Sequence, residues 1–249
     1  ANCGCFLPDF RQGKRNLDRW AQTMARWQGS GYGCSMWGDD GYENSRDLSW
    51  NLFAYNAESS WTGRPGRADF ESRFQATFYG ATLPPLVRLV ETLQTRRRLS
   101  PRRGWNLFRF TMPALARLAR KNPKTVARAK HDLRLHERML AEVGKARRLA
   151  RREKDHLDHF VVAIERERDL CRRLILAARI GRGLSGAPLR TAVQAALLDL
   201  AAVRDRYRML WLRHSKRQNI EISLKVYDNI AASLCGLLRS APLTGERFS

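Results

Sequence analysis

Residues 189–210 read LRTAVQAALLDLAAVRDRYRML, and this stretch decides the fold of the second part of the chain. Apolar side chains recur in it at alternating spacings of four and three residues: Leu189, Val193, Ala196, Leu200, Val203, Tyr207 and Leu210. This spacing puts the apolar side chains on one face of an α-helix. The stretch therefore predicts a long helix that buries one face in a helical bundle.

The sequence on both sides of this stretch continues the helical pattern. Upstream, an apolar series interrupted by Glu167 follows the same register: Leu157, Phe160, Ile164, Cys171, Leu174 and Ala178. Downstream, a last helix is expected over residues 219–238. Helix breaks or turns are expected at 100–101, 122–123, 152–155 and 181–186. We therefore predict an antiparallel bundle of three or four long helices over residues 85–249.

Charge separates this helical part from the residues before it. Residues 1–84 contain nine acidic and nine basic side chains, so the whole net charge of +22 belongs to the residues that follow. Five of the seven tryptophans, in contrast, lie in residues 1–84. The two parts therefore differ in composition, and we predict a domain boundary at Pro84-Pro85.

Residues 1–84 have the pattern of an α/β unit. We expect a helix that Asn16 caps, then a short strand over residues 32–37, and then the acidic turn 38–41. Asp47 is expected to cap the next helix, and Asp69 a shorter one that Gly80 ends. This order is typical of the last strand and helix segments of a TIM-type β/α barrel, in which ligand-binding groups lie at the C-terminal ends of strands. The predicted fold is thus α/β followed by all-α.

The candidate binding site lies in Trp37-Gly38-Asp39-Asp40-Gly41. A sugar offers an apolar ring face and a rim of hydroxyl groups, so its pocket needs an aromatic platform and nearby hydrogen-bond acceptors. Trp37 supplies the platform, and Asp39 and Asp40 supply the acceptors. The alternative is a surface turn beside a core tryptophan.

Several stretches resemble the family 20 glycoside hydrolases, the β-N-acetylhexosaminidases. The resemblance stretches are residues 13–16, 31–41, 49–61, 69–80 and, more weakly, 207–213. The resemblance implies that Trp37 forms one wall of the subsite for the cleaved sugar and that Asp39 binds the hydroxyl groups of that sugar. It also implies an N-acetylhexosaminide substrate and no cofactor or metal.

The family's catalytic motif is absent from this sequence. Members cleave with an adjacent Asp-Glu pair on an earlier strand, and no Asp-Glu dipeptide occurs here. We therefore expect the chain to be the C-terminal part of the catalytic barrel plus an appended helical domain, inactive alone and without catalytic residues of its own. The sequence does not indicate a cellular location, and no apolar run is long enough to span a membrane.

The rival hypothesis is a basic helical module that binds nucleic acid or acts as a scaffold. Basic runs at residues 96–98, 102–103 and 145–152 could contact phosphates. They are not interleaved with aromatic residues, so we expect only weak, salt-sensitive binding to nucleic acid. A homodimer through the helical domain and a docking surface for acidic polymers are two further alternatives. A metal site at His156 and His159, beside Asp155 and Asp158, competes with a solvated charged face, which we favour.

Overall fold

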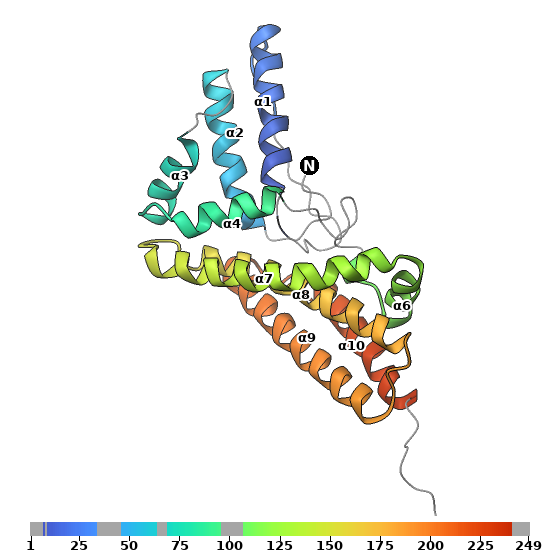
Figure 1. Ribbon diagram of the computed structural model, residues 1–249. Helices are drawn as coiled ribbons and strands as arrows, with labels where there is room; N and C mark the ends of the chain where they lie inside the picture. Colours follow the sequence, from blue (N-terminus) through green and yellow to red (C-terminus); the bar gives the residue numbers. More distant parts are fainter. Residues whose placement is uncertain (1–6, 8, 34–45, 64–68, 96–106, 241–249) are drawn as a thin grey trace, which may run out of the picture. The chain divides into compact units, whose positions relative to one another are not determined.

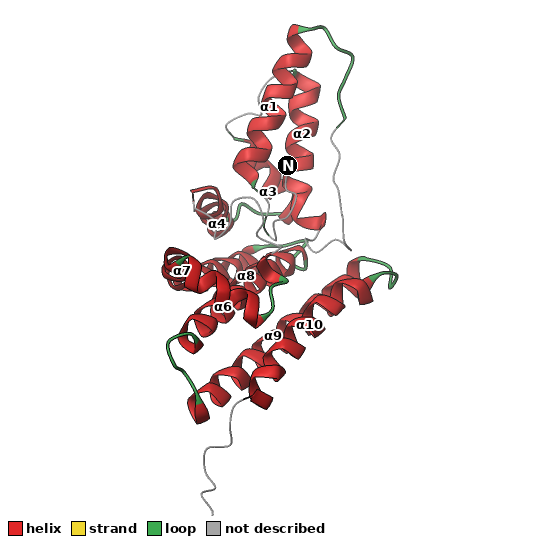
Figure 2. Ribbon diagram, turned by 90° about the vertical axis from the view of Figure 1, so that its right-hand side faces the viewer, coloured by secondary structure: helices red, strands yellow, loops and turns green. Residues whose placement is uncertain are grey.

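The computed structural model describes residues 7, 9–33, 46–63, 69–95 and 107–240 (Figure 1). Every regular element in these ranges is a helix (Figure 2). The chain forms two compact units: unit 1 contains residues 1–98 and 138–164, and unit 2 contains residues 99–137 and 165–249. Two long helices, α7 (Pro123–Leu149) and α8 (His156–Ile180), contribute residues to both units.

The predicted β/α-barrel segment is wrong for the part of the chain that the structure describes. No strand occurs there, and Tyr32 and Gly33, the first residues of the predicted strand, have no regular structure. The remaining residues of that strand, 34–37, lie outside the described residues. A strand is stable only when a neighbouring strand satisfies its backbone hydrogen bonds, and the described part offers no such neighbour. The fold of the described residues is therefore all-helical.

Two parallel helices form the first part of unit 1. Helix α1 spans Phe10–Arg26 and helix α2 spans Trp50–Thr62, preceded by the short 3-10 helix η2 at Arg46–Ser49. They lie side by side and run in the same direction (Figures 1 and 2). Gly13 permits this close packing, because a Cβ atom there would lie 2.9 Å from the Leu52 side chain.

Helix α1 begins earlier than the sequence predicts. Asp9 is its N-cap, and its carboxylate accepts a hydrogen bond of 3.0 Å from the backbone N–H of Gln12. Asn16, the predicted cap, lies inside the helix, where its side chain accepts a hydrogen bond from Gln12. The buried residues Phe10, Leu17 and Ala21 share the inner face of the helix.

Helix α3 (Phe70–Tyr79) follows the prediction closely, with Asp69 as N-cap and Gly80 as a left-handed C-cap at φ = 71°. Phe70 stacks on Phe74, and Phe74 on Phe78, at centroid distances of 5.9 and 5.2 Å. Helix α4 (Pro84–Thr95) begins at the predicted domain boundary, which stays a prediction. The Gln75 side chain accepts a hydrogen bond of 2.7 Å from the backbone N–H of Leu83 and so holds the two helices together.

Unit 2 contains α6 (Met112–Lys121), the hairpin of α9 (Gly186–His214) and α10 (Ile220–Ser240), and parts of α7 and α8. All seven apolar residues predicted to line one face of α9 are buried. The predicted helix breaks at 122–123, 152–155 and 181–186 are confirmed by the bounds of α6 to α9. The break at 100–101 lies outside the described residues. The Ser233 hydroxyl of α10 accepts a hydrogen bond of 2.7 Å from the backbone N–H of Met112, which ties α6 to the hairpin.

Candidate functional site

The three predicted sugar-binding residues, Trp37, Asp39 and Asp40, lie outside the described residues. The structure does describe the helices on either side of them, α1 and α2, and the resemblance stretches that these helices carry. The described resemblance stretches of unit 1 can therefore be located in the fold, and their contacts with one another follow.

A polar network connects α1, α2 and α3. The Lys14 ammonium group of α1 forms an ion pair with Glu71 of α3. The second carboxylate oxygen of Glu71 accepts a hydrogen bond of 2.9 Å from the buried Asn51 amide of α2. The Tyr55 hydroxyl of α2 donates a hydrogen bond of 2.8 Å to Asp18 of α1. One network thus brings together three resemblance stretches, residues 13–16, 49–61 and 69–80.

Aromatic rings enclose the Lys14 ammonium group. Its Nζ atom lies 5.1 Å from the ring centroids of both Tyr55 and Phe70, which meet edge to face. These two rings also pack with Leu17 in a small apolar cluster. Burial lowers the pKa of Lys14 to about 8, and the nearby Asp18 carboxylate opposes this shift. The network is therefore a partly buried cation held by one carboxylate and two rings.

Glu58 of α2 forms an ion pair with α3. Its carboxylate accepts a hydrogen bond of 2.6 Å from Arg73 of α3, whose Nε also contacts Asp69 at 3.1 Å. Glu58 and Arg73 both belong to resemblance stretches. This pair is a second connection between α2 and α3.

The solvated face expected around the histidines of α8 is wrong for His156 and His159, which are both buried. His159 Nε2 lies 3.5 Å from the Asp47 carboxylate. In His156, Nδ1 lies 2.8 Å from the Tyr79 hydroxyl and Nε2 lies 2.7 Å from the Asp47 carbonyl oxygen. Because that carbonyl can only accept, Nε2 carries the proton and Nδ1 accepts from Tyr79. Asp155 and Asp158 both contact Arg147. Burial raises the pKa of Tyr79, which keeps its hydroxyl protonated as the donor.

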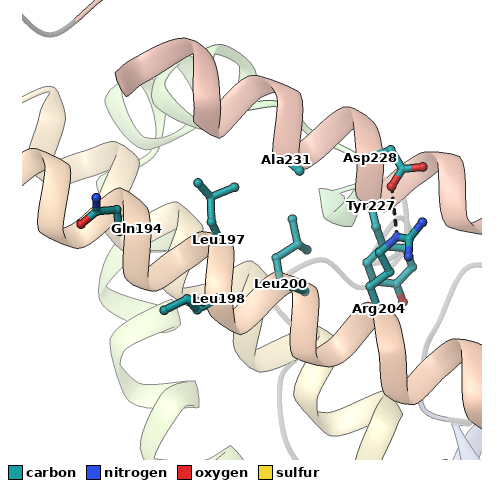
Figure 3. Close-up of a pocket in the computed structure, with 9 residues that line it drawn as sticks. Gln194, Leu197, Leu198, Leu200, Arg204, Tyr227, Asp228 and Ala231 are labelled. Atoms are coloured by element: carbon teal, nitrogen blue, oxygen red, sulfur yellow. Dashed lines mark hydrogen bonds and ion pairs between the residues drawn. The ribbon is translucent and has the colours of Figure 1, made fainter. Parts of the chain in front are cut away.

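A groove in unit 2 lies between α9 and α10 (Figure 3). Its volume is about 600 Å³, and Leu197 and Leu200 of α9 are directed toward Ala231 of α10. At one end Arg204 and Asp228 form an ion pair at 3.0 Å. The two charged side chains that line the groove are thus paired with each other. This geometry supplies an apolar surface but no acid and base pair for catalysis.

Most of the basic run at 145–152, predicted to contact phosphates, is engaged within unit 1. Lys145 pairs with Glu142 at 2.7 Å, and Arg147 pairs with Asp158. Arg152 donates a hydrogen bond of 2.9 Å to the carbonyl oxygen of Thr77. The other two predicted basic runs, 96–98 and 102–103, lie outside the described residues.

Another basic surface, which the sequence reasoning missed, lies on α6 and the first part of α7. Its six exposed cations are Arg117, Arg120, Lys121, Lys124, Lys130 and Arg134. None of them forms an ion pair with another described residue. The composition of the sequence could have indicated this surface, because residues 112–134 contain a single carboxylate, Asp132. In the structure that carboxylate is buried and pairs with Arg128. We call these six residues the α6–α7 basic surface.

Other basic residues of unit 2 are buried in its core. Arg173 is fully buried, pairs with Asp169 at 2.7 Å, and donates to the carbonyl oxygens of Phe108 and Phe110 at 3.0 Å. Arg166 donates to the Tyr227 hydroxyl at 2.6 Å and lies 4.3 Å from the Tyr207 ring centroid. The formal charge of the sequence therefore overstates the number of cations available to a partner.

Comparisons with known proteins do not assign the chain to a group. No family model, no curated protein and no solved structure matches it. Within the described residues, no helix combines the length and the apolar character needed to cross a membrane.

Proposed function

We propose that residues 1–84 contribute the tryptophan and carboxylate wall of a sugar pocket in a glycoside hydrolase similar to the β-N-acetylhexosaminidases. In this proposal Trp37 stacks on the ring of the bound sugar, and Asp39 and Asp40 accept hydrogen bonds from its hydroxyl groups. The chain contributes binding residues, and it does not contribute the Asp-Glu pair of that family.

One observation carries the proposal. Three resemblance stretches that are separated in the sequence converge through Lys14, Asn51 and Glu71. A chance likeness confined to short peptides would not require these stretches to contact one another. Their convergence supports a single structural unit, in which α1 and α2 flank the segment that contains Trp37.

The proposal is tested in an active enzyme that carries this sequence. Trp37→Ala removes the stacking platform and Asp39→Ala removes a charged acceptor. Each is expected to cost about 2 to 4 kcal/mol of transition-state stabilisation, measured as the loss of kcat/KM. Trp27→Ala is the matched control, because Trp27 is 73% exposed at the end of α1, and kcat/KM should change less than about twofold.

The proposal fails if Trp37→Ala and Asp39→Ala both retain near-normal kcat/KM. The motif would then be a structural turn beside a core tryptophan. A loss of the same size in Trp27→Ala would also count against the proposal, because it would indicate a general effect of removing tryptophan from unit 1.

A further inference from the structure

A pocket in unit 1 lies where helices α1 and α2 end. The two helices run side by side in the same direction, so their C-terminal ends lie together (Figures 1 and 2). A Cβ atom at Gly63, the C-cap of α2, would lie 3.7 Å from the Ala25 side chain of α1. The volume of the pocket is about 400 Å³, within the range of about 300 to 1,000 Å³ that is typical of small-molecule sites. We call it the α1–α2 pocket, and its described lining lies within residues 21–32 and 60–63.

The lining of the α1–α2 pocket favours an uncharged ligand. None of the described residues that line it is an Asp, Glu, Lys, Arg or His. The last carbonyl groups of two helices also point toward this end of unit 1, and their partial negative charge disfavours an anion. The described lining offers a cation no carboxylate, and Arg26 already places a positive charge in the last turn of α1, where it lies 5.8 Å from the Trp27 ring centroid.

The pocket combines an exposed indole with uncharged hydrogen-bonding groups. Trp61 is 91% exposed at the end of α2. The Gln28 side-chain amide forms no hydrogen bond with another described residue. The Ser60 hydroxyl donates to the Asn56 carbonyl oxygen at 2.7 Å, so its lone pairs can still accept. A ligand that suits this lining has an apolar face for the indole and hydroxyl groups at its rim.

The backbone of Gln28 has a conformation that glutamine rarely adopts. Its φ angle is 52°, in the left-handed region, where a Cβ atom is unfavourable. The backbone N–H of the next residue, Gly29, donates to the Met24 carbonyl oxygen at 2.9 Å, so Gln28 occupies the position after α1 at which glycine is most common. Glutamine there costs stability but places an amide in the α1–α2 pocket. Backbone strain of this kind is typical of ligand sites.

We infer that the α1–α2 pocket binds a neutral sugar of the β-linked glucopyranose type, with Trp61 stacked on the sugar ring and the Gln28 amide bound to its hydroxyl groups. In such a sugar the hydroxyl groups are equatorial and the axial C–H bonds form apolar ring faces, which suit an indole. The inference does not rest on the proposed function, because it uses described residues alone and does not involve the Trp37 motif.

The test uses the full chain and cellobiose, a neutral disaccharide of β-linked glucose. We expect cellobiose to shift the Trp61 indole signal in ¹H–¹⁵N spectra, and calorimetric titration to give a Kd of about 1 mM. The Trp61 signal is identified by its absence from Trp61→Ala, and this variant should raise the Kd about tenfold or more. Trp27→Ala is the matched control: it removes an indole that is 73% exposed at the end of α1 and does not line the pocket, so the Kd should change less than about twofold.

A second pair of variants separates ligand binding from folding. Gln28→Gly removes the amide and relieves the backbone, so the Kd should rise about threefold or more while the Tm stays the same or rises. Glu153→Gly is the matched control, because Glu153 of unit 1 also has a positive φ angle, 48°, and does not line the pocket. Its Tm should respond in the same way, and its Kd should be unchanged.

Undetectable binding of cellobiose would overturn the inference, as would equal losses in Trp61→Ala and Trp27→Ala or an unchanged Kd in Gln28→Gly. Tighter binding of tetramethylammonium than of cellobiose, with the same loss in Trp61→Ala, would overturn it in favour of a cation site at the two helix ends.

Trp37→Ala distinguishes this inference from the proposed function. If it weakens cellobiose binding as much as Trp61→Ala does, the inference of a separate site is overturned. If cellobiose binding is retained in Trp37→Ala and lost in Trp61→Ala, the inference stands, even where Trp37→Ala leaves kcat/KM near normal and the proposed function fails.

Discussion

Lys14 is a residue of unit 1 whose ionisation depends on the fold. Its pKa falls from 10.5 to about 8 because burial disfavours the charged ammonium group. Between these two values the unfolded chain binds more protons at this position than the folded chain does. The free energy of unfolding must therefore increase as the pH rises through this window.

We predict that unit 1 becomes more stable between about pH 8 and pH 10, by up to about 3 kcal/mol from Lys14. Urea unfolding followed by tryptophan fluorescence measures this change, since five of the seven tryptophans lie in residues 1–84. Lys14→Met is the control: it keeps the length of the side chain but cannot titrate, so the alkaline gain should disappear. An equal gain in Lys14→Met would assign the effect to another group.

The sequence predicts which residues are candidates for this network but not that they meet. Lys14, Asn51 and Glu71 belong to stretches that sequence reasoning had singled out, and all three lie in or beside predicted helices. The contact between Lys14 and Glu71 joins residues 57 positions apart. Such a contact depends on how α1, α2 and α3 pack, and helical periodicity carries no information about packing partners.

Helix α8 contains two adjacent arginines in opposite environments. Arg173 and its partner Asp169 are almost fully buried, whereas the side chains of Arg172 and Asp199 are 39% and 38% exposed. Burial raises the pKa of Asp169, while Arg173 lowers it. Loss of Arg173 would leave a buried carboxylate and the carbonyl oxygens of Phe108 and Phe110 without this donor.

We predict that Arg173→Met destabilises unit 2 by about 3 to 5 kcal/mol, because a buried charge loses its partner. Arg172→Met is the matched control and should cost less than about 1 kcal/mol, since its ion pair is exposed. Adding Asp169→Asn to Arg173→Met should recover part of the loss by removing the unpaired charge. Thermal unfolding of the three variants measures these differences. Similar losses in the two single variants would contradict the prediction.

Local sequence determines some features of the helices, and other features depend on tertiary packing. The breaks at 122–123 and 181–186 were predicted because proline and glycine act within a few residues. The end of α9 at His214 was not predicted. The predicted strand at 32–37 depended on strands elsewhere, which the described part does not contain. The charged residues Arg166, Asp169 and Arg173 interrupt the apolar face of α8 and are nonetheless buried, because they satisfy one another and nearby aromatic and carbonyl groups.

The described carboxylates of residues 1–84 bear on the expected lack of activity. Glycoside cleavage needs a proton donor whose carboxyl group is available to the glycosidic oxygen. The described carboxylates are instead engaged: Asp9 caps α1, Asp18 accepts from Tyr55, Asp47 accepts from Trp50, Glu58 and Asp69 bind Arg73, and Glu71 binds Lys14. Asp39, Asp40 and Glu43 are outside the described residues, and the sequence contains no Asp-Glu pair.

We therefore predict that the 249-residue chain, made alone, hydrolyses no N-acetylhexosaminide. The described carboxylates of residues 1–84 contact other groups of the fold, those of the Trp37 motif are proposed to bind hydroxyl groups, and the sequence has no Asp-Glu dipeptide to supply the acid that the resembled family uses. An assay of the purified chain with a chromogenic N-acetylglucosaminide measures this directly. The control variant is Asp205→Asn, at an exposed residue of unit 2. The prediction is contradicted by turnover above the uncatalysed background that persists in this control but disappears in Asp39→Asn or Asp40→Asn. The acidic turn would then be performing the cleavage itself.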